Sequence, residues 1–228
     1  MRYLDSGINR FVAIFTALYA ISILSFFGLY LSTGYALSSV LLGGFLAILP
    51  VPVWLLLSLL IDRKEPEPKW MLAAAFVWGS SIAAIFALII NNIFGNFLSE
   101  NWIAMLIAPI SEEICKGSLL FIFLLFIRKH INGVRDGIVY AVIIGLGFAM
   151  TENMVYYASS FQYSFSEGMG DFVNRGLLTP FLHPIFTSLT GIGIGIASKR
   201  DEGNKVAYEG LAWAVAAHAL WNILAIYL

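Results

Sequence analysis

The chain has 228 residues, of which 60% are hydrophobic and 12% charged, and its formal net charge at pH 7 is −1. Soluble domains average about 25% charged residues, so this composition excludes an ordinary soluble domain and predicts an all-α, polytopic protein of the cell membrane. The sequence has no basic run of the kind that binds nucleic acid, and its single cysteine, Cys115, excludes an intramolecular disulfide.

Seven apolar stretches have the roughly 20 residues that a membrane-spanning helix requires. They are residues 10–31, 38–61, 70–94, 102–127, 136–158, 176–197 and 207–228. The first stretch is longer than the hydrophobic core of a signal peptide and lacks a small-residue cleavage site, so we expect it to be retained as a helix. Together the seven stretches predict one integral membrane domain that occupies residues 1–228.

The basic residues predict the orientation of these spans. Eleven of the 13 Lys and Arg residues precede the first span or follow the second, fourth or sixth. The eleven are Arg2, Arg10, Arg63, Lys64, Lys69, Arg128, Lys129, Arg135, Lys199, Arg200 and Lys205. The positive-inside rule then places the N-terminus in the cytoplasm and the C-terminus outside. Of the remaining two, Lys116 lies within a span and Arg175 is predicted on the outer side.

Several ionisable residues lie inside the predicted spans. Span 102–127 carries Glu112, Glu113 and Lys116 near its centre, where a charge costs at least about 2.5–3.5 kcal/mol. At 1.5 Å per residue, Glu112 lies about 15 Å from the outer end of this span. The later spans carry Glu152, His183 and His218. All these residues are predicted between mid-membrane and the outer surface, so one pocket that opens outwards would accommodate them.

Local spacing supports this convergence. Glu112 and Glu113 precede Lys116 by four and three residues, so one lysine can reach either carboxylate. His218 and Asn222 share a helix face, and Asn153 directly follows Glu152. A structural ion cluster or interhelical hydrogen bonds would explain each feature separately. Their conjunction at similar depth favours a functional site.

A series of short motifs runs along the chain in a fixed order. They are Asp62-Arg63-Lys64-Glu65-Pro66-Glu67-Pro68, Ala108-Pro109 with Glu112-Glu113-x-x-Lys116, Asp136-Gly137 with Tyr140, Gly147-Phe148-x-x-x-Glu152-Asn153, His183, and His218-Ala219-Leu220-Trp221-Asn222. This series resembles the PrsW-type intramembrane proteases, which are distant relatives of the CAAX prenyl endopeptidases and the wider CPBP group. The prenyl endopeptidases carry a histidine where this chain has Glu152, so neither their water-activating pair nor their prenyl substrates can be transferred to it.

The resemblance implies an intramembrane endopeptidase whose catalytic part lies at about 102–228. It implies that a peptide bond of a membrane-protein substrate is cut near the outer side of the bilayer, with single-span anti-sigma factors as the known substrate type. The expected partners are therefore this substrate and the lipid bilayer. The motifs GxSxG and HExxH are absent, so a serine hydrolase elbow and a helix-borne zinc motif are not expected.

Two versions of the chemistry are compatible with the residues. Without a metal, Glu112 or Glu113 activates water while the histidines and Asn222 polarise the carbonyl group. With a metal, Glu152, His183 and His218 form a His₂Glu ligand set for one zinc ion, and Glu112 or Glu113 is the base. The candidate catalytic residues are Glu112, Glu113, Glu152, His183 and His218, and the supporting residues are Lys116, Asn153 and Asn222.

A proton- or ion-coupled transporter is the competing class, because carboxylates and histidines within spans also form proton relays. Transporters often contain two similar halves. This chain shows no such internal repeat, and its buried polar residues are concentrated in the last four predicted spans. These two observations favour the protease.

Overall fold

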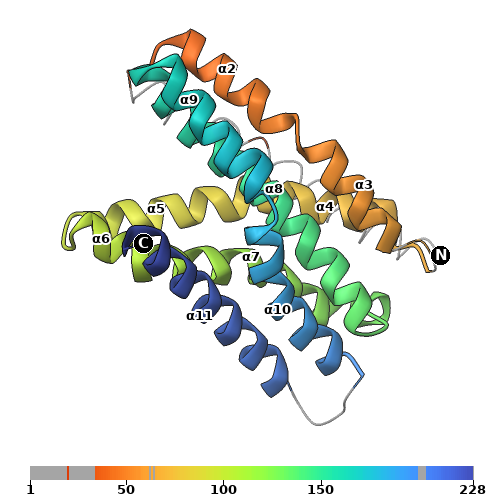
Figure 1. Ribbon diagram of the computed structural model, residues 1–228. Helices are drawn as coiled ribbons and strands as arrows, with labels where there is room; N and C mark the ends of the chain where they lie inside the picture. Colours follow the sequence, from red (N-terminus) through yellow and green to blue (C-terminus); the bar gives the residue numbers. More distant parts are fainter. Residues whose placement is uncertain (1–19, 21–33, 62, 64, 200–203, 228) are drawn as a thin grey trace.

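The computed structural model describes residues 20, 34–61, 63, 65–199 and 204–227, and every regular element in these residues is a helix (Figure 1). The α-helices are α2 (Leu37–Ile48), α3 (Val51–Ile61), α4 (Lys69–Val77), α5 (Ala84–Gly95), α6 (Glu100–Trp102), α7 (Ala108–Phe126), α8 (Val134–Tyr163), α9 (Phe165–Asp171), α10 (Leu182–Ala197) and α11 (Lys205–Tyr227). The π-helical segments Trp78–Ala83, Ile103–Ile107 and Phe172–Leu178 connect α4 to α5, α6 to α7, and α9 to the turn before α10.

Within the described residues, five helical stretches are long and apolar enough to cross a membrane. They are Leu37–Leu60, Lys69–Gly95, Val134–Tyr163, Phe165–Ala197 and Lys205–Tyr227. These stretches overlap five of the seven predicted spans and confirm an all-α, multi-pass membrane protein. The predicted span 10–31 lies outside the described residues. The predicted span 102–127 is helical through α7, but it carries three charged residues near its centre. The count of seven spans and the N-in, C-out orientation therefore stay predictions.

Prolines divide two of the predicted spans. Helix α2 ends at Ile48 and α3 begins at Val51, with Pro50 between them. Helix α10 begins at Leu182, shortly after Pro180, although the apolar pattern predicted a span from residue 176. Proline has no backbone N–H to donate and disfavours helical geometry in the residue before it, so a new helix starts after each of these positions.

Helix α8 is the central element. It has 30 residues, and at 1.5 Å per residue its length is about 45 Å, more than the roughly 30 Å of a hydrocarbon core. Figure 1 shows α2 and α3 along one side of α8, with α10 and α11 on the other side. Helices α5 and α7 contact each other and lie side by side. Helix α8 therefore adjoins both the α5–α7 pair and the α10–α11 pair.

A glycine lets α8 and α10 approach each other beside His183. A Cβ atom on Gly145 would lie only 2.7 Å from the backbone nitrogen of Pro184, so a larger residue would push the two helices apart. Small residues commonly permit this kind of contact between membrane helices. The close approach brings the start of α10 against the middle of α8, where Phe148 and Glu152 follow.

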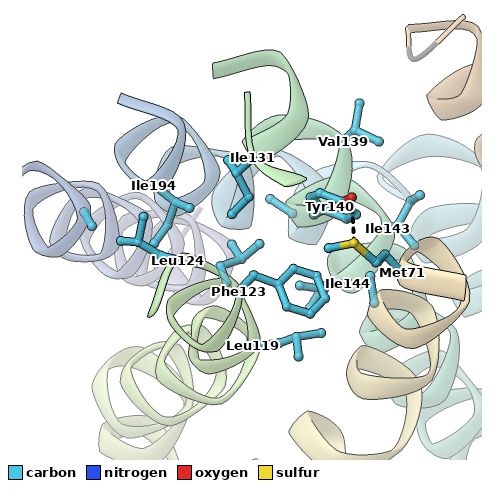
Figure 2. Packing of buried hydrophobic residues seen from close by; sticks show 14 of the residues in the cluster. Met71, Leu119, Phe123, Leu124, Ile131, Val139, Tyr140, Ile143, Ile144 and Ile194 are labelled. Atoms are coloured by element: carbon cyan, nitrogen blue, oxygen red, sulfur yellow. Dashed lines mark hydrogen bonds between the residues drawn. The ribbon is translucent and has the colours of Figure 1, made fainter. Parts of the chain in front are cut away.

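The main hydrophobic core includes Val139, Tyr140, Ile143 and Ile144 from the first half of α8 (Figure 2). Tyr140 packs edge-on against Phe123 with ring centroids 5.3 Å apart, and its hydroxyl lies 3.4 Å from the sulfur of Met71. The same hydroxyl donates a hydrogen bond to the buried carboxylate of Glu67. Two motifs of the series quoted above, those around Glu67 and Tyr140, thus contact each other about 18 Å along α8 from Glu152.

A second contact joins the same two regions. The guanidinium of Arg135 pairs with the carboxylate of Glu65, and Asp136 accepts a hydrogen bond of 2.6 Å from the backbone N–H of Asn132. Asp62 and Lys64 of the first motif lie outside the described residues. These contacts attach the segment before α4 to the start of α8, which is a structural role separate from the cluster described next.

Candidate active site

Lys116 lies at the centre of the predicted polar cluster and is fully buried. Its ammonium lies 3.2 Å from Glu112 Oε2, 2.9 Å from Glu113 Oε1 and 2.9 Å from His183 Nδ1. It also lies 3.9 Å from the centre of the Phe148 ring, a cation–π contact. All three N–H bonds of the ammonium are thereby directed to acceptors on α7 and α10.

Glu113 is held by contacts from three helices. Besides Lys116 on its own helix, its carboxylate accepts a hydrogen bond of 2.9 Å from the hydroxyl of Thr187 on α10 and lies 3.1 Å from Nδ1 of His218 on α11. The side chain is completely buried. A carboxylate in this position is an anchor that ties α7, α10 and α11 together.

Glu112 has a different environment although it is the adjacent residue. Among the described residues, Lys116 is its hydrogen-bond donor, and Oε2 also lies 3.8 Å from His183 Nδ1 and 3.9 Å from His218 Nε2. Glu112 lines a cavity of about 590 Å³ between α5, α7 and α8. Of the two adjacent glutamates, Glu112 is therefore the one that lines this cavity.

The contacts of His183 determine its tautomer. An ammonium group can only donate, so Nδ1 of His183 accepts the hydrogen bond from Lys116. The ring hydrogen then lies on Nε2, which is 2.6 Å from Glu152 Oε2 and donates to that carboxylate. The nitrogen of His183 that carries a lone pair is thus the one that faces Glu112.

His218 has the corresponding arrangement with Glu113. A carboxylate accepts, so Nδ1 of His218 carries a hydrogen and donates to Glu113. In the neutral ring, Nε2 keeps its lone pair, and this atom is the one 3.9 Å from Glu112. The two imidazole rings lie 5.1 Å apart at 84°, and Phe186 stacks on His218 at 4.9 Å. Each histidine therefore has one carboxylate behind it and directs its other nitrogen towards Glu112.

Arg175 was not among the predicted site residues, yet it contacts two of them. It belongs to the π-helical segment Phe172–Leu178, and π-helical turns are frequent at functional sites. Its guanidinium donates to Glu152 Oε2 at 2.8 Å and to Asn153 Oδ1 at 2.9 Å, and it lies 3.8 Å above the ring of Tyr156. The available signal was that Arg175 is the one basic residue predicted on the outer side.

Thr187 was also missed, although its position contained a signal. It follows His183 by four residues and so lies one turn further along the same face of α10. The supporting residue Asn222 takes a place beside the cluster, because its Nδ2 atom donates to the backbone oxygen of Ala104 at 2.8 Å. Asn222 lines a second cavity of about 260 Å³, together with His183 and His218.

The side chains of the cluster offer donor atoms of the kind that a metal ion needs. Glu112, His183 and His218 each offer one ligand atom, and these atoms all lie within 4.8 Å of one another. Two imidazoles and one carboxylate form a usual ligand set for catalytic zinc, and a ligating histidine commonly donates its other N–H to a carboxylate. His183 with Glu152 and His218 with Glu113 match that second feature. The residues therefore fit a zinc ion. The ion would bind the lone pair on Nδ1 of His183, which accepts the hydrogen bond from Lys116.

This set differs from the predicted ligands in one residue. The sequence predicted Glu152 with the two histidines, whereas the structure groups Glu112 with them and places Glu152 against Nε2 of His183 and against Arg175. The spacing of residues along the chain did not indicate that Glu112 takes the place of Glu152 in this set. Which of the two glutamates lies beside the histidines depends on how α7 and α8 are rotated about their axes. The identity of the metal ligands stays a prediction.

Comparison with known proteins gives the family. The model of a family described as PrsW family intramembrane metalloprotease matches residues 67–228. The relative "Protease PrsW" of Clostridioides difficile is 31% identical over 166 residues, which are 70% of this chain and 67% of the relative. The "Protease PrsW" of Oceanobacillus iheyensis is 27% identical over 158 residues, which are 68% of this chain and 69% of the relative. No solved structure shows a significant match.

The matched region begins at Glu67 and contains α7, α8, α10 and α11, the helices that carry the polar cluster. It also contains Arg175 and Thr187, which the motif analysis missed. Since the match covers well over half of the chain, the chain belongs to the PrsW family of intramembrane metalloproteases.

Proposed function

We propose that the cluster around Lys116 hydrolyses a peptide bond of a membrane-protein substrate and that Glu112 is the carboxylate that activates the water. The observation that carries this proposal is the difference between the two adjacent glutamates. Glu112 lines the larger cavity, whereas Glu113 is completely buried and bonded to Lys116, Thr187 and His218. A general base must reach the water that attacks, and Glu112 alone of the pair lies on such a space.

In the reaction, Glu112 takes a proton from the water as the water oxygen bonds to the carbonyl carbon. The carbonyl oxygen becomes an oxyanion, which requires a hydrogen-bond donor. One N–H of Asn222 binds Ala104, so its second N–H is available to this oxygen from the wall of the smaller cavity. Glu112 then passes the proton to the leaving nitrogen as the C–N bond breaks, which releases a carboxylic acid and an amine.

Lys116, Glu152 and Arg175 position the other groups of the site. Lys116 fixes Glu112 relative to His183, and Arg175 fixes Glu152, which in turn orients the His183 ring. Glu112, His183 and His218 would hold a zinc ion, which would supply Lewis-acid chemistry at this place. With Glu112 as a ligand, Glu152 would be the other carboxylate on the wall of the larger cavity that could accept a proton.

The proposal extends to the substrate. The predicted orientation places the cluster between mid-membrane and the outer surface, which suits a single-span membrane protein cut near its outer side. The family resemblance suggests anti-sigma factors as one such class. The transporter alternative is set aside because the family match identifies a protease.

The test compares cells that produce the wild-type chain with cells that produce Glu112→Gln, at equal protein levels in the membrane. New N-termini of membrane proteins are identified by mass spectrometry. We expect a small set of new N-termini that appear only with the wild-type chain and lie within or beside apolar segments. Identical sets in the two strains would overturn the assignment of Glu112.

A further inference from the structure

The two cavities beside the cluster meet at one boundary. The larger cavity, about 590 Å³, lies between α5, α7 and α8, and the smaller one, about 260 Å³, lies between α8, α10, α11 and the segment Phe172–Leu178. Ala104, Glu152 and Tyr156 line both cavities. Glu152 and Tyr156 are four residues apart on one face of α8, so together with Ala104 they form the boundary that the two cavities share.

The candidate catalytic groups are divided between the same two spaces. Glu112 lines the larger cavity, His183 and His218 line the smaller one, and Glu152 lines both. A carbonyl group that is attacked from the side of Glu112 and polarised from the side of Asn222 must therefore lie at the boundary. The substrate chain that continues in each direction from this carbonyl then enters a different cavity.

We propose that the substrate binds as an extended peptide across this boundary, with residues on one side of the scissile bond in the larger cavity and residues on the other side in the smaller cavity. This inference rests on the proposed function and adds the form of the substrate. An intact helix is about 10 Å wide and holds its carbonyl groups in its own hydrogen bonds. The class of substrate is therefore a membrane-protein segment that is unwound, next to or within its span.

The walls of both cavities suit a peptide backbone. Asn91, Asn92 and Asn96 line the larger cavity, and Asn174 and Asn222 line the smaller one. Side-chain amides both donate and accept hydrogen bonds, as an extended backbone requires, whereas a lipid chain offers no such partners. The amide of Asn91 is also tied to the catalytic helix, because its oxygen accepts a hydrogen bond of 2.8 Å from the hydroxyl of Ser111, the residue before Glu112.

A hydrogen bond fixes the backbone at the boundary between the two cavities. Ala104 belongs to the π-helical segment Ile103–Ile107, and its backbone oxygen accepts the hydrogen bond of Asn222. Ala104 has only a methyl side chain at this shared boundary. A larger side chain at this position would take up space from both cavities without altering any candidate catalytic group.

The test uses purified protein in detergent and a library of peptides from a digested proteome, with cleavage sites read by mass spectrometry. Leu88→Trp narrows the larger cavity and Ala225→Trp narrows the smaller one, since each residue lines only that cavity. We expect Leu88→Trp to change residue preference on one side of the scissile bond and Ala225→Trp to change it on the opposite side. Ala216→Trp, on an exposed position of α11, should leave the preferences unchanged.

Ala104→Leu should lower kcat/KM for all peptides by about tenfold or more, because a pocket filled by extra methylene groups loses affinity of this order. Preferences that change on the same side in both tryptophan variants, or wild-type rates in Ala104→Leu, would overturn the two-cavity binding mode. If the wild-type protein cleaves no peptide in the library, the proposed function fails, and a binding experiment still decides this inference.

The binding experiment places the photo-crosslinker p-benzoylphenylalanine at position 88 or 225 in the Glu112→Gln variant. In a peptide that both positions capture, the two crosslinks should fall at different peptide residues. The residue crosslinked from position 88 should always lie on the same side, N-terminal or C-terminal, of the residue crosslinked from position 225. Crosslinks whose order along the peptide varies, or capture at only one of the two positions, would overturn the inference whether or not cleavage occurs.

Discussion

The Nε2 atom of His183 lies 2.6 Å from a carboxylate oxygen of Glu152, and this contact decides which nitrogen of the ring faces the rest of the cluster. Arg175 binds the same carboxylate oxygen at 2.8 Å. His218 repeats the arrangement with Glu113 at 3.1 Å. Two histidines, each with a carboxylate behind it, thus direct their remaining nitrogens towards Glu112.

The two adjacent glutamates should respond differently to the same substitution. Glu112→Gln should lower the cleavage rate by about 10²–10⁴-fold, as expected for loss of a general base. It should lower the melting temperature less than Glu113→Gln, because Glu112 is bonded to Lys116 whereas Glu113 is bonded to Thr187 and His218 as well. Glu113→Gln removes the charge that pairs with buried Lys116, and breaking a buried pair costs about 3–5 kcal/mol, so this variant should melt well below wild type. Thermal unfolding in detergent and a cleavage assay on the same preparations measure both effects. Full activity in Glu112→Gln would contradict the assignment of the base.

Arg175 should act through Glu152 and His183. Arg175→Met should lower kcat by about 10–100-fold, the range seen when a residue behind a ligand or catalytic histidine is removed, with little change in KM. The ¹⁵N chemical shifts of His183 should change from a ring protonated at Nε2 to a mixture of tautomers. The control is Arg128→Met, because Arg128 binds backbone oxygens of Ala197 and Ser198 at the far end of α10. An unchanged His183 spectrum in Arg175→Met would show that the arginine is only structural.

Metal content separates the two versions of the chemistry. If zinc is used, purified protein should contain about one zinc ion per chain, a strong chelator should abolish cleavage and added zinc should restore it. Glu112→Gln should then lose the metal, whereas Glu152→Gln should still bind one zinc ion with about 10–100-fold lower affinity. Loss of all zinc from Glu152→Gln but not from Glu112→Gln would favour the ligand set named from the sequence. Full activity of the chelated, metal-free protein would exclude the metal version.

The contact between Glu67 and Tyr140 should support stability and not catalysis. Tyr140→Phe keeps the packing against Phe123 but removes a hydrogen bond to a buried carboxylate, a type of bond that contributes about 1.5–3 kcal/mol. We expect a lower melting temperature and an unchanged kcat. The check is thermal unfolding beside single-turnover cleavage. A large loss of kcat at an unchanged melting temperature would instead connect this end of α8 to the active site.

The predicted orientation is tested by labelling. Single cysteines are placed by Glu65→Cys and Gly170→Cys in a Cys115→Ala background, and intact cells are treated with an impermeant maleimide. Residue 170 suits the purpose because a side chain added there meets no atom within 4 Å. Position 170 should be labelled and position 65 should not. The reverse result would turn the cavities towards the cytoplasm and redirect the search for substrates.

Much of the candidate site could be predicted from the sequence because charges inside an apolar stretch are a local property. Glu112, Glu113, Lys116, Glu152, His183 and His218 are costly to place in a membrane, so their positions alone mark them as unusual. Helix length and hydropathy likewise predicted an all-α membrane protein without any tertiary information. The order of the short motifs then indicated the family, which the comparisons confirmed.

The tertiary structure alone decided which of these groups contact one another. The tautomers of the histidines, the different environments of Glu112 and Glu113, and the contact of Arg175 with Glu152 depend on how the helices are rotated and how closely they approach. Periodicity along one helix predicts which face a residue occupies but not which residue of another helix lies opposite it. That information comes from packing, for example from the absence of a side chain on Gly145 where α10 crosses α8.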